Sequence, residues 1–249
     1  MSVSFVKNPN LPKKRVRDCI IGSAYTEENK ELTELGINCI KLSRLPTLDD
    51  EISSHADIQA FNKGNGDLII SKQAGEKLKE NLNDFNLTIE KNIKSPYPND
   101  IKLNAAFIGN KIICNKSFVS KEIITFANEN NIEIIHTKQG YSRCSLCIVN
   151  ENAVITEDPG LAYLLNIYQF DVLKITPGKI HLSEAHSGFI GGASAKLSEN
   201  EMYFSGDISK HPDFDEIKAF LDNYNISMVY YKSRILTDFG GFIQLTEAH

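Results

Sequence analysis

A weak fivefold self-similarity runs through this chain, with a pattern that recurs about every forty to fifty residues. Each repeat reads as a short apolar strand, a polar turn, a second apolar strand, a helix and a third strand. One small or polar residue can be taken as the anchor of each repeat, and successive anchors lie 47, 41, 48 and 47 residues apart. The anchors are Asp57, Asn104, Ser145, Ala193 and Gly240. Internal periods of this length are typical of repeat architectures, in which equivalent units pack side by side.

The repeats predict one α/β domain over residues 1–249. Four complete units are expected at residues 55–94, 101–137, 142–176 and 189–232. The fifth is split, because residues 236–249 supply its first strand and residues 16–43 supply a strand, a helix and a strand. Pairing of the two chain ends would close a pseudo-fivefold propeller of ββαβ units and leave few exposed strand edges. A doubly wound parallel sheet is the main alternative, but it does not contain this many tight hairpins.

Local signals place the elements within each unit. In the first unit, strand residues 58–61 lead into a Gly- and Asn-rich turn, and a helix is expected over residues 72–84. In the second unit, Ser117 is expected to cap a helix that reaches residue 130. In the third, Pro159 is expected at the first helical position, where its missing N–H costs nothing, and we expect both Glu157 and Asp158 to cap that helix.

Composition and charge narrow the functional classes. The net charge of −5 and the pI near 5.7 argue against nucleic acid, which requires a basic face to neutralise phosphates. Five cysteines without tight spacing do not indicate a disulfide framework. Near the N-terminus only residues 19–21 form an apolar run, so we expect neither a signal peptide nor a membrane anchor. We therefore predict a cytoplasmic protein whose partner is a small molecule; the sequence does not indicate an oligomeric state.

Five short motifs resemble the pentein family of guanidino-group-modifying enzymes, and an uncharacterised clostridial family assigned to that fold. They lie at residues 55–61 (HADIQAF), 139–147 (QGYSRCSLC), 155–158 (ITED), 188–194 (GFIGGAS) and 236–241 (LTDFGG). The resemblance implies five ββαβ units around a pseudo-fivefold axis. It also implies a pocket at that axis for a guanidino or amidine group, and chemistry that needs no cofactor.

His55 and Asp57 are the sharpest candidates for catalysis and binding. The resemblance implies that His55 acts as general acid and base and that Asp57 binds the guanidinium. A carboxylate accepts two parallel N–H bonds from a planar guanidinium, and a histidine exchanges protons near neutral pH. If the segment is extended, residues two apart point to the same side and both face one pocket. The alternative is a histidine that forms a turn and an aspartate that caps the next element.

Cys144 is the candidate nucleophile, because it lies beside an anchor and beside Arg143, a cation that would favour the thiolate. With Cys147 it forms a Cys-x-x-Cys pair, which suggests a metal or redox site. No second pair stands at zinc spacing, however, and on a strand the two side chains would point to opposite faces. The alternative for each of the two is a buried cysteine without a chemical role.

Two motifs depart from the family pattern. The resemblance implies carboxylates near residues 190 and 193, where this chain has Ile190 and Ala193. It also implies a catalytic cysteine after Gly241, and none follows. The remaining predicted ligand-binding residues are Asn104, Ser145, Ser194 and Asp238. His181, His186 and His211 have no companion at metal-ligand spacing, so we predict no metal site and interpret these three as surface or turn residues.

Three functions remain open from the sequence. The first is a cysteine-dependent hydrolase or transferase of a guanidino or amidine compound, with His55 and Cys144 as catalytic residues. The second is a non-catalytic member that binds a small molecule or a partner in the same pocket, which the missing C-terminal cysteine favours. The third is a metal-dependent hydrolase that uses His55, Asp57 and a further carboxylate.

Overall fold

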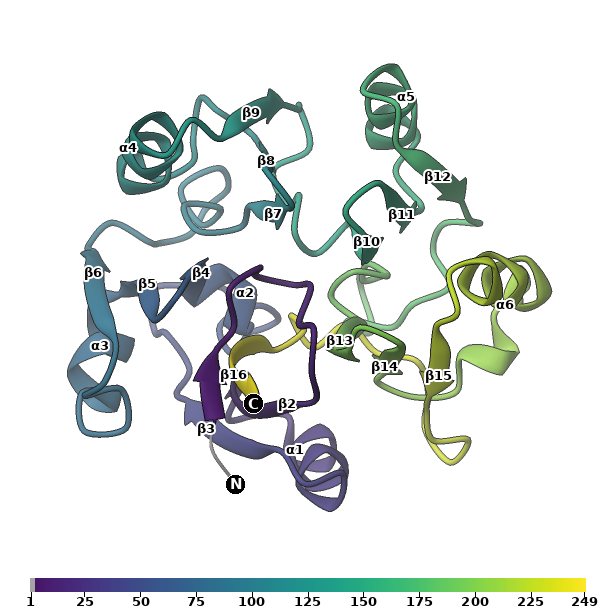
Figure 1. Cartoon of the computed structure of the whole chain (residues 1–249), viewed down its shortest axis with the longest axis horizontal. Helices are drawn as coiled ribbons and strands as arrows, with labels where there is room; N and C mark the ends of the chain where they lie inside the picture. Colours follow the sequence, from purple (N-terminus) through teal and green to yellow (C-terminus); the bar gives the residue numbers. More distant parts are fainter. Residues whose placement is uncertain (1–2) are drawn as a thin grey trace.

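A computed structural model describes residues 3–249 and contains five small sheets with helices outside them (Figure 1). Four of the sheets have three strands, and the fifth has four. In each three-stranded sheet the first two strands form an antiparallel hairpin and the third pairs parallel to the second after a helix. The repeating order predicted from the sequence is therefore present in all four complete units.

The first two units occupy the N-terminal half of the chain. The first comprises β4 (Ala60–Gly64), β5 (Asp67–Ser71), α3 (Lys72–Leu78) and β6 (Asn86–Glu90), and follows the short α2 (Ala56–Gln59). The second comprises β7 (Ala106–Ile108), β8 (Lys111–Cys114), α4 (Lys121–Glu129) and β9 (Glu133–His136). Both hairpins turn through residues with positive φ, Asn65 and Gly66 in the first and Gly109 in the second.

The next two units repeat the same arrangement. The third comprises β10 (Cys147–Asn150), β11 (Ala153–Thr156), α5 (Pro159–Ile167) and β12 (Asp171–Lys174). The fourth comprises β13 (Ser194–Ser198), β14 (Glu201–Phe204), the 3₁₀ turn η1 (Ile208–Lys210), α6 (Phe214–Asn223) and β15 (Ser227–Val229).

The two chain ends share the fifth sheet. It contains β1 (Val3–Phe5), β2 (Val16–Gly22) and β3 (Asn38–Leu42), with α1 (Thr26–Glu34) between β2 and β3, and the C-terminal β16 (Ile243–Ala248). β16 lies between β1 and β2 and pairs antiparallel with both. The predicted pairing of N- and C-terminal segments is thus observed. Among residues 3–249 no strand ladder joins one sheet to the next.

Side-chain packing and ion pairs connect the sheets. β10 lies beside β13, and β16 lies beside β4. Arg234, in the segment after β15, forms ion pairs with Glu28 and with Glu31 of α1, the latter at 3.0 Å. The hydroxyl of Tyr203 on β14 also donates to Glu31. The fourth unit is therefore tied to the sheet that holds both chain ends. Figure 1 shows the first strand of each unit toward the middle of the molecule and the longer helices, α1 and α3 to α6, toward its outside.

Buried apolar residues lie between each helix and its sheet. The clusters mix residues from neighbouring units; one, for example, combines Ile20 of β2, Leu68 of β5 and Ile243 of β16. α4 and α6 each present one apolar face to such a cluster, including Ile123 of α4 and Ile217 of α6. Because these side chains are fully buried, the packing of each unit fixes the orientation of the loops next to it.

Several predicted boundaries were wrong. Ile58 lies in the single helical turn α2, and the strand begins only at Ala60. The helix expected over residues 72–84 ends at Leu78 and continues as turns. The cap of α4 is Ser120, not Ser117, because the Ser120 side chain accepts from the Glu122 N–H. Asp158 does cap α5, with Pro159 at the first turn, as predicted.

The five cysteines are all free. No helix within residues 3–249 is long and apolar enough to span a membrane.

Candidate active site

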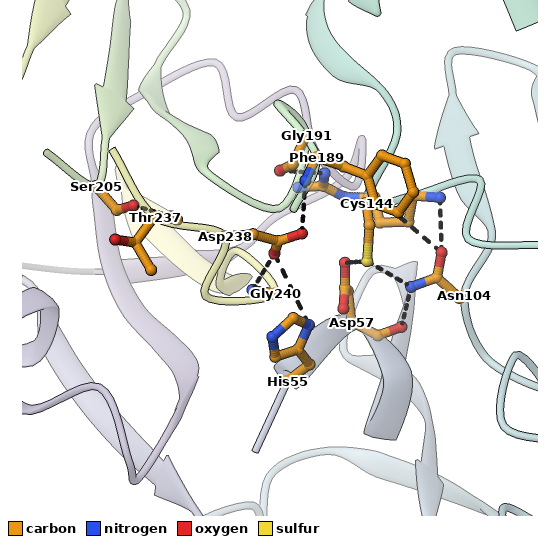
Figure 2. A network of polar contacts seen from close by, with 11 residues as sticks. His55, Asp57, Asn104, Cys144, Phe189, Gly191, Ser205, Thr237, Asp238 and Gly240 are labelled. Atoms are coloured by element: carbon orange, nitrogen blue, oxygen red, sulfur yellow. Dashed lines mark hydrogen bonds and ion pairs between the residues drawn. The ribbon is translucent and has the colours of Figure 1, made fainter. Parts of the chain in front are cut away.

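A pocket of about 250 Å³ is lined mainly by residues of the segments that precede α2, β10, β13 and β16. The polar side chains buried most deeply in its lining are His55, Cys144 and Asp238, each exposing no more than 2% of its surface. They come from three different parts of the chain: the residue before α2, the turn before β10 and the loop before β16. Figure 2 shows them with Asp57 and Asn104 as one polar cluster.

Close backbone packing fixes the position of His55. It is the extended residue that precedes α2, and the Asp57 N–H of that turn donates to the Gly240 carbonyl at 3.3 Å. Gly240 has φ of +72°, and a Cβ there would lie 2.5 Å from the His55 Cβ. Only glycine allows the C-terminal loop to approach His55 so closely. Tyr25 packs on the other side, with its ring centroid 5.8 Å from that of His55.

The thiol of Cys144 lies against a carboxylate and an amide. Its Sγ donates to Asp57 Oδ2 at 2.8 Å, and Asn104 Nδ2 donates to the same sulfur at 3.1 Å (Figure 2). The Asn104 side-chain oxygen accepts from the Arg143 and Cys144 backbone N–H groups, at 2.8 and 3.4 Å. Asn104 therefore holds both the sulfur and the turn that carries it.

Arg143 does not act as predicted. Its guanidinium donates to Asn10 Oδ1 at 2.9 Å and to the Gly191 carbonyl at 3.1 Å, rather than to the Cys144 thiol. Burial, followed by the negative charges of Asp57 and Asp238, raises the pKa of Cys144 well above its ordinary value. Burial and the neighbouring carboxylates therefore favour the protonated thiol, in place of the thiolate that Arg143 was expected to favour.

Asp238 faces His55 from the C-terminal loop. Its Oδ1 lies 3.8 Å from His55 Nδ1 and accepts from the Gly240 N–H, and its Oδ2 accepts from the Phe189 N–H at 2.9 Å. A Cβ on Gly192 would lie 1.9 Å from Asp238 Oδ1. The absence of a side chain at Gly192 therefore makes room for this carboxylate.

Several polar atoms of the cluster have no hydrogen-bond partner. They are both ring nitrogens of His55 and the Oδ1 of Asp57. Burial is the main cause that raises the pKa of Asp57 to about 6; the Asp238 charge also raises it, while His55 and Arg143 oppose the shift. Buried polar atoms without a partner are costly in a folded protein, so these three atoms are available to pair with a water molecule, an ion or a ligand.

A metal ion is one species that the cluster could hold. One donor atom each from His55, Asp57 and Cys144 lie within 4.8 Å of one another. A sulfur, a nitrogen and a carboxylate oxygen form a donor set that suits zinc. The residues therefore fit a thiophilic divalent ion, with Cys144 in place of the second carboxylate that the sequence suggested.

The sequence profile of a family of unknown function, DUF6873, matches residues 20–243. The chain belongs to this family. A search of curated protein sequences found no match.

Solved structures show the fold of this DUF6873 protein. An agmatine deiminase from C. jejuni is 12% identical, with a TM-score of 0.59 over 97% of this chain and 96% of the other. An amidinotransferase of saxitoxin biosynthesis from Microseira wollei is 11% identical, with a TM-score of 0.62 over 99% and 98%. The inosamine-phosphate amidinotransferase of Streptomyces griseus is 9% identical, with a TM-score of 0.60 over 99% and 97%. All three are penteins, so the DUF6873 protein has the pentein fold.

The structure brings together five of the seven predicted site residues: His55, Asp57, Asn104, Cys144 and Asp238. The other two lie outside this network. Ser145 is buried with its hydroxyl unpartnered, and Ser194 donates its hydroxyl to the Ile190 carbonyl.

Residues missed by the sequence analysis form the walls and mouth of the pocket. They are Asp49, Glu51, Ile52, Ile58, Tyr141, Leu182, His186, Ser187 and Phe189. Most lie in loops outside the repeated strands, so the anchor pattern carried no signal for them. His186 and His211 were expected to be surface or turn residues. His186 is exposed but also lines the pocket, and His211 lies in the turn between η1 and α6, where it is 5% exposed.

Glu157 is a buried carboxyl beside the cluster, and it does not cap α5 as predicted. Its Oε2 accepts from the Ile190 N–H at 3.2 Å. Burial raises the pKa of Glu157 to about 8, and the charges of Asp238 and Asp158 add to the shift. The folded protein therefore holds this proton over a pH range in which the unfolded chain has lost it.

Glu157→Gln should change how stability depends on pH. A carboxyl whose folded pKa is raised contributes stability below its unfolded pKa of 4.5, and this is lost as pH rises toward about 8. We expect the free energy of unfolding of the variant, measured relative to that of wild type, to rise by on the order of 1–5 kcal/mol between pH 5 and pH 8.5. Urea unfolding at both pH values measures this difference. A difference that does not change with pH would show that Glu157 is ionised in the folded protein.

Proposed function

We propose that this DUF6873 protein is a cysteine-dependent enzyme that acts on the planar carbon of a guanidino or amidine small molecule. One observation carries the proposal: the Cys144 Sγ lies 2.8 Å from Asp57 Oδ2, in a cluster with His55, at the floor of a pocket. A nucleophile, a proton acceptor and carboxylates for a cation are thus within reach of one ligand.

A guanidinium bound at the floor would change the protonation of the thiol. Its positive charge would offset the carboxylates that keep Cys144 protonated, because a nearby cation favours a thiolate. In the proposed step His55 takes the thiol proton. The sulfur then forms a bond to the central carbon, and Asp57 and Asp238 hold the nitrogens in place.

Bond breaking completes the proposed cycle. The C–N bond to one nitrogen breaks, and His55 returns the proton to the leaving amine, which leaves a thiouronium on Cys144. Water then adds to the same carbon, His55 takes one of its protons, and the sulfur departs and is protonated again. A guanidine and water thus give a ureido product and ammonia when an unsubstituted nitrogen leaves, or urea and an amine when the substituted nitrogen leaves. If an amine replaces water, the product is a new guanidine and the reaction is an amidino transfer.

The similar structures support this chemistry by analogy. They include a deiminase and two amidinotransferases, according to their names. At 9–12% identity they share the fold, and the activity of this chain is inferred from its own cluster.

We also propose that the five units close into one propeller-like ring within a single domain, residues 1–249, in a cytoplasmic protein. The position of β16 between β1 and β2 supports closure, as do the contacts of β16 with β4 and of Arg234 with α1. Closure would bring loops from all five units to the common pocket.

Two alternatives have an observation in their favour. A non-catalytic binding protein is favoured by the protonated, buried thiol of Cys144 and by the absence of a cysteine after Gly241. A metal-dependent hydrolase is favoured by the donor set of His55, Asp57 and Cys144. Elemental mass spectrometry of the purified protein tests for bound metal.

Alkylation of Cys144 by matched reagents separates the proposed enzyme from the non-catalytic protein. Chloroacetamidine and chloroacetamide share one electrophilic carbon, but only the amidine carries a cationic group. After correction for their rates with free cysteine, we expect the amidine to label Cys144 at least about 10-fold faster, since charge-assisted hydrogen bonds would hold it. Peptide mapping identifies the labelled residue. Equal corrected rates at Cys144, or labelling only elsewhere, would favour a non-catalytic protein.

A further inference from the structure

The lining of the pocket is buried at its floor and exposed at its mouth, so a ligand bound at the floor has its other end at the mouth. His55, Cys144 and Asp238 form the buried floor. Asp49 and His186 are exposed at the mouth. A ligand held at the floor by a guanidinium therefore extends its remaining atoms past the walls to the mouth.

The walls between floor and mouth are largely apolar. Ile52, Tyr141, Leu182 and Phe189 are partly buried, and Ile58 is fully buried. The Tyr141 and Phe189 rings have centroids 6.3 Å apart. Such walls suit an aliphatic chain, since they offer it apolar contact.

The mouth carries negative charge. Asp49 and Glu51 line it, and no lysine or arginine within residues 3–249 lines the pocket. The basic side chain of His186 also lines the mouth, and its Nδ1 contacts both oxygens of Glu51, at 3.0 and 3.1 Å. Ser183 donates to the same carboxylate at 2.6 Å. No fixed cation is left over to bind an anionic group of a ligand.

We propose that the pocket selects a ligand with two cationic ends joined by an apolar spacer, a guanidine at the floor and an amine at the mouth, and disfavours a ligand whose far end carries a carboxylate. This rests on the proposed function, and it adds the chemistry of the distal end. An amine at the mouth would be attracted by Asp49 and Glu51. A carboxylate there would face the like charges of Asp49 and Glu51, and no lysine or arginine of the pocket lining would pair with it, so such a ligand is disfavoured.

Three probes of similar length test the selection. Agmatine has a guanidinium and an amine, n-butylguanidine has the guanidinium alone, and arginine adds a carboxylate to the carbon that carries the amine. Titration calorimetry of the Cys144→Ser protein at low salt avoids turnover during the measurement. We expect agmatine to bind about 10-fold more tightly than n-butylguanidine, the effect of one charge-assisted hydrogen bond, and arginine to bind more weakly than agmatine by at least the same factor.

Variants at the mouth test whether its carboxylates cause the preference for agmatine over n-butylguanidine. Glu51→Gln should reduce the preference for agmatine over n-butylguanidine to within about 3-fold, because one attractive charge is gone. Glu184→Gln is the matched control, since Glu184 is exposed in the loop that carries His186 but does not line the pocket. It should leave the preference unchanged.

The outcomes distinguish this inference from the function on which it rests. If n-butylguanidine binds but arginine equals agmatine, or agmatine equals n-butylguanidine, charge selection at the mouth is wrong while a guanidino site stands. If none of the three binds, the proposed function is wrong and the selection proposal is wrong with it.

Discussion

Asp57→Asn is expected to weaken binding of n-butylguanidine by roughly 10–100-fold, the loss associated with a hydrogen bond to a charged group. Asp57 is 2% exposed, and its Oδ1 has no partner in the protein. In the proposed complex this oxygen accepts an N–H from the guanidinium. The amide of asparagine has the same shape but no charge, and it offers one acceptor in place of two. Calorimetry in the Cys144→Ser background measures the change.

Folding should not suffer in this variant. The pKa of Asp57 is raised to about 6 because the buried site disfavours its charge, so a neutral side chain is tolerated there at neutral pH. The matched control is Asp207→Asn, which alters another buried carboxylate; it bonds Ser209 and Lys210 and is not part of the cluster of His55, Asp57 and Cys144. If the two variants bind n-butylguanidine equally well, Asp57 does not contact the ligand.

The repeat could be read from the sequence because each unit contains a hairpin turn and an amphipathic helix in the same order. Asn65 and Gly66 adopt the positive φ that their types favour, and Pro159 begins α5. These are local preferences, and the structure follows them.

Boundaries that depend on tertiary packing were less predictable. The apolar run at Ile58 fits a strand as well as a buried helical turn. The folded chain has the turn, in which the Asp57 N–H donates to the carbonyl of the distant Gly240. Ser117 and Ser120 both have the chemistry of a cap. Ser120 takes the role; its backbone N–H bonds the Lys102 carbonyl and its hydroxyl bonds Glu90, two distant partners that no local pattern shows.

The candidate site was predictable where residues lie near the anchors. Asp57 and Asn104 are anchors, and Cys144 is next to one, so the repeat alone places them together. The direction of the Arg143 side chain was not predictable, because sequence adjacency to Cys144 does not show that the guanidinium turns toward Asn10. The mouth residues Glu51 and His186 lie in loops without a repeated pattern, and only the folded chain brings them together.

The nucleophilic role of Cys144 is the central claim, and the rate of amine or ammonia release from the best-bound guanidine tests it most directly. Wild type, Cys144→Ser and Cys147→Ser are compared at the same protein concentration. Cys147 is the matched control, since it is buried, its pKa is raised to about 11, and it lies outside the pocket lining.

We expect Cys144→Ser to lower the rate by at least about 10³-fold, because a hydroxyl in this site cannot replace the sulfur as nucleophile. Cys147→Ser should keep most of the wild-type rate. Turnover by Cys144→Ser within about 10-fold of wild type, or no release by wild type from any guanidine that binds, would contradict catalysis by Cys144.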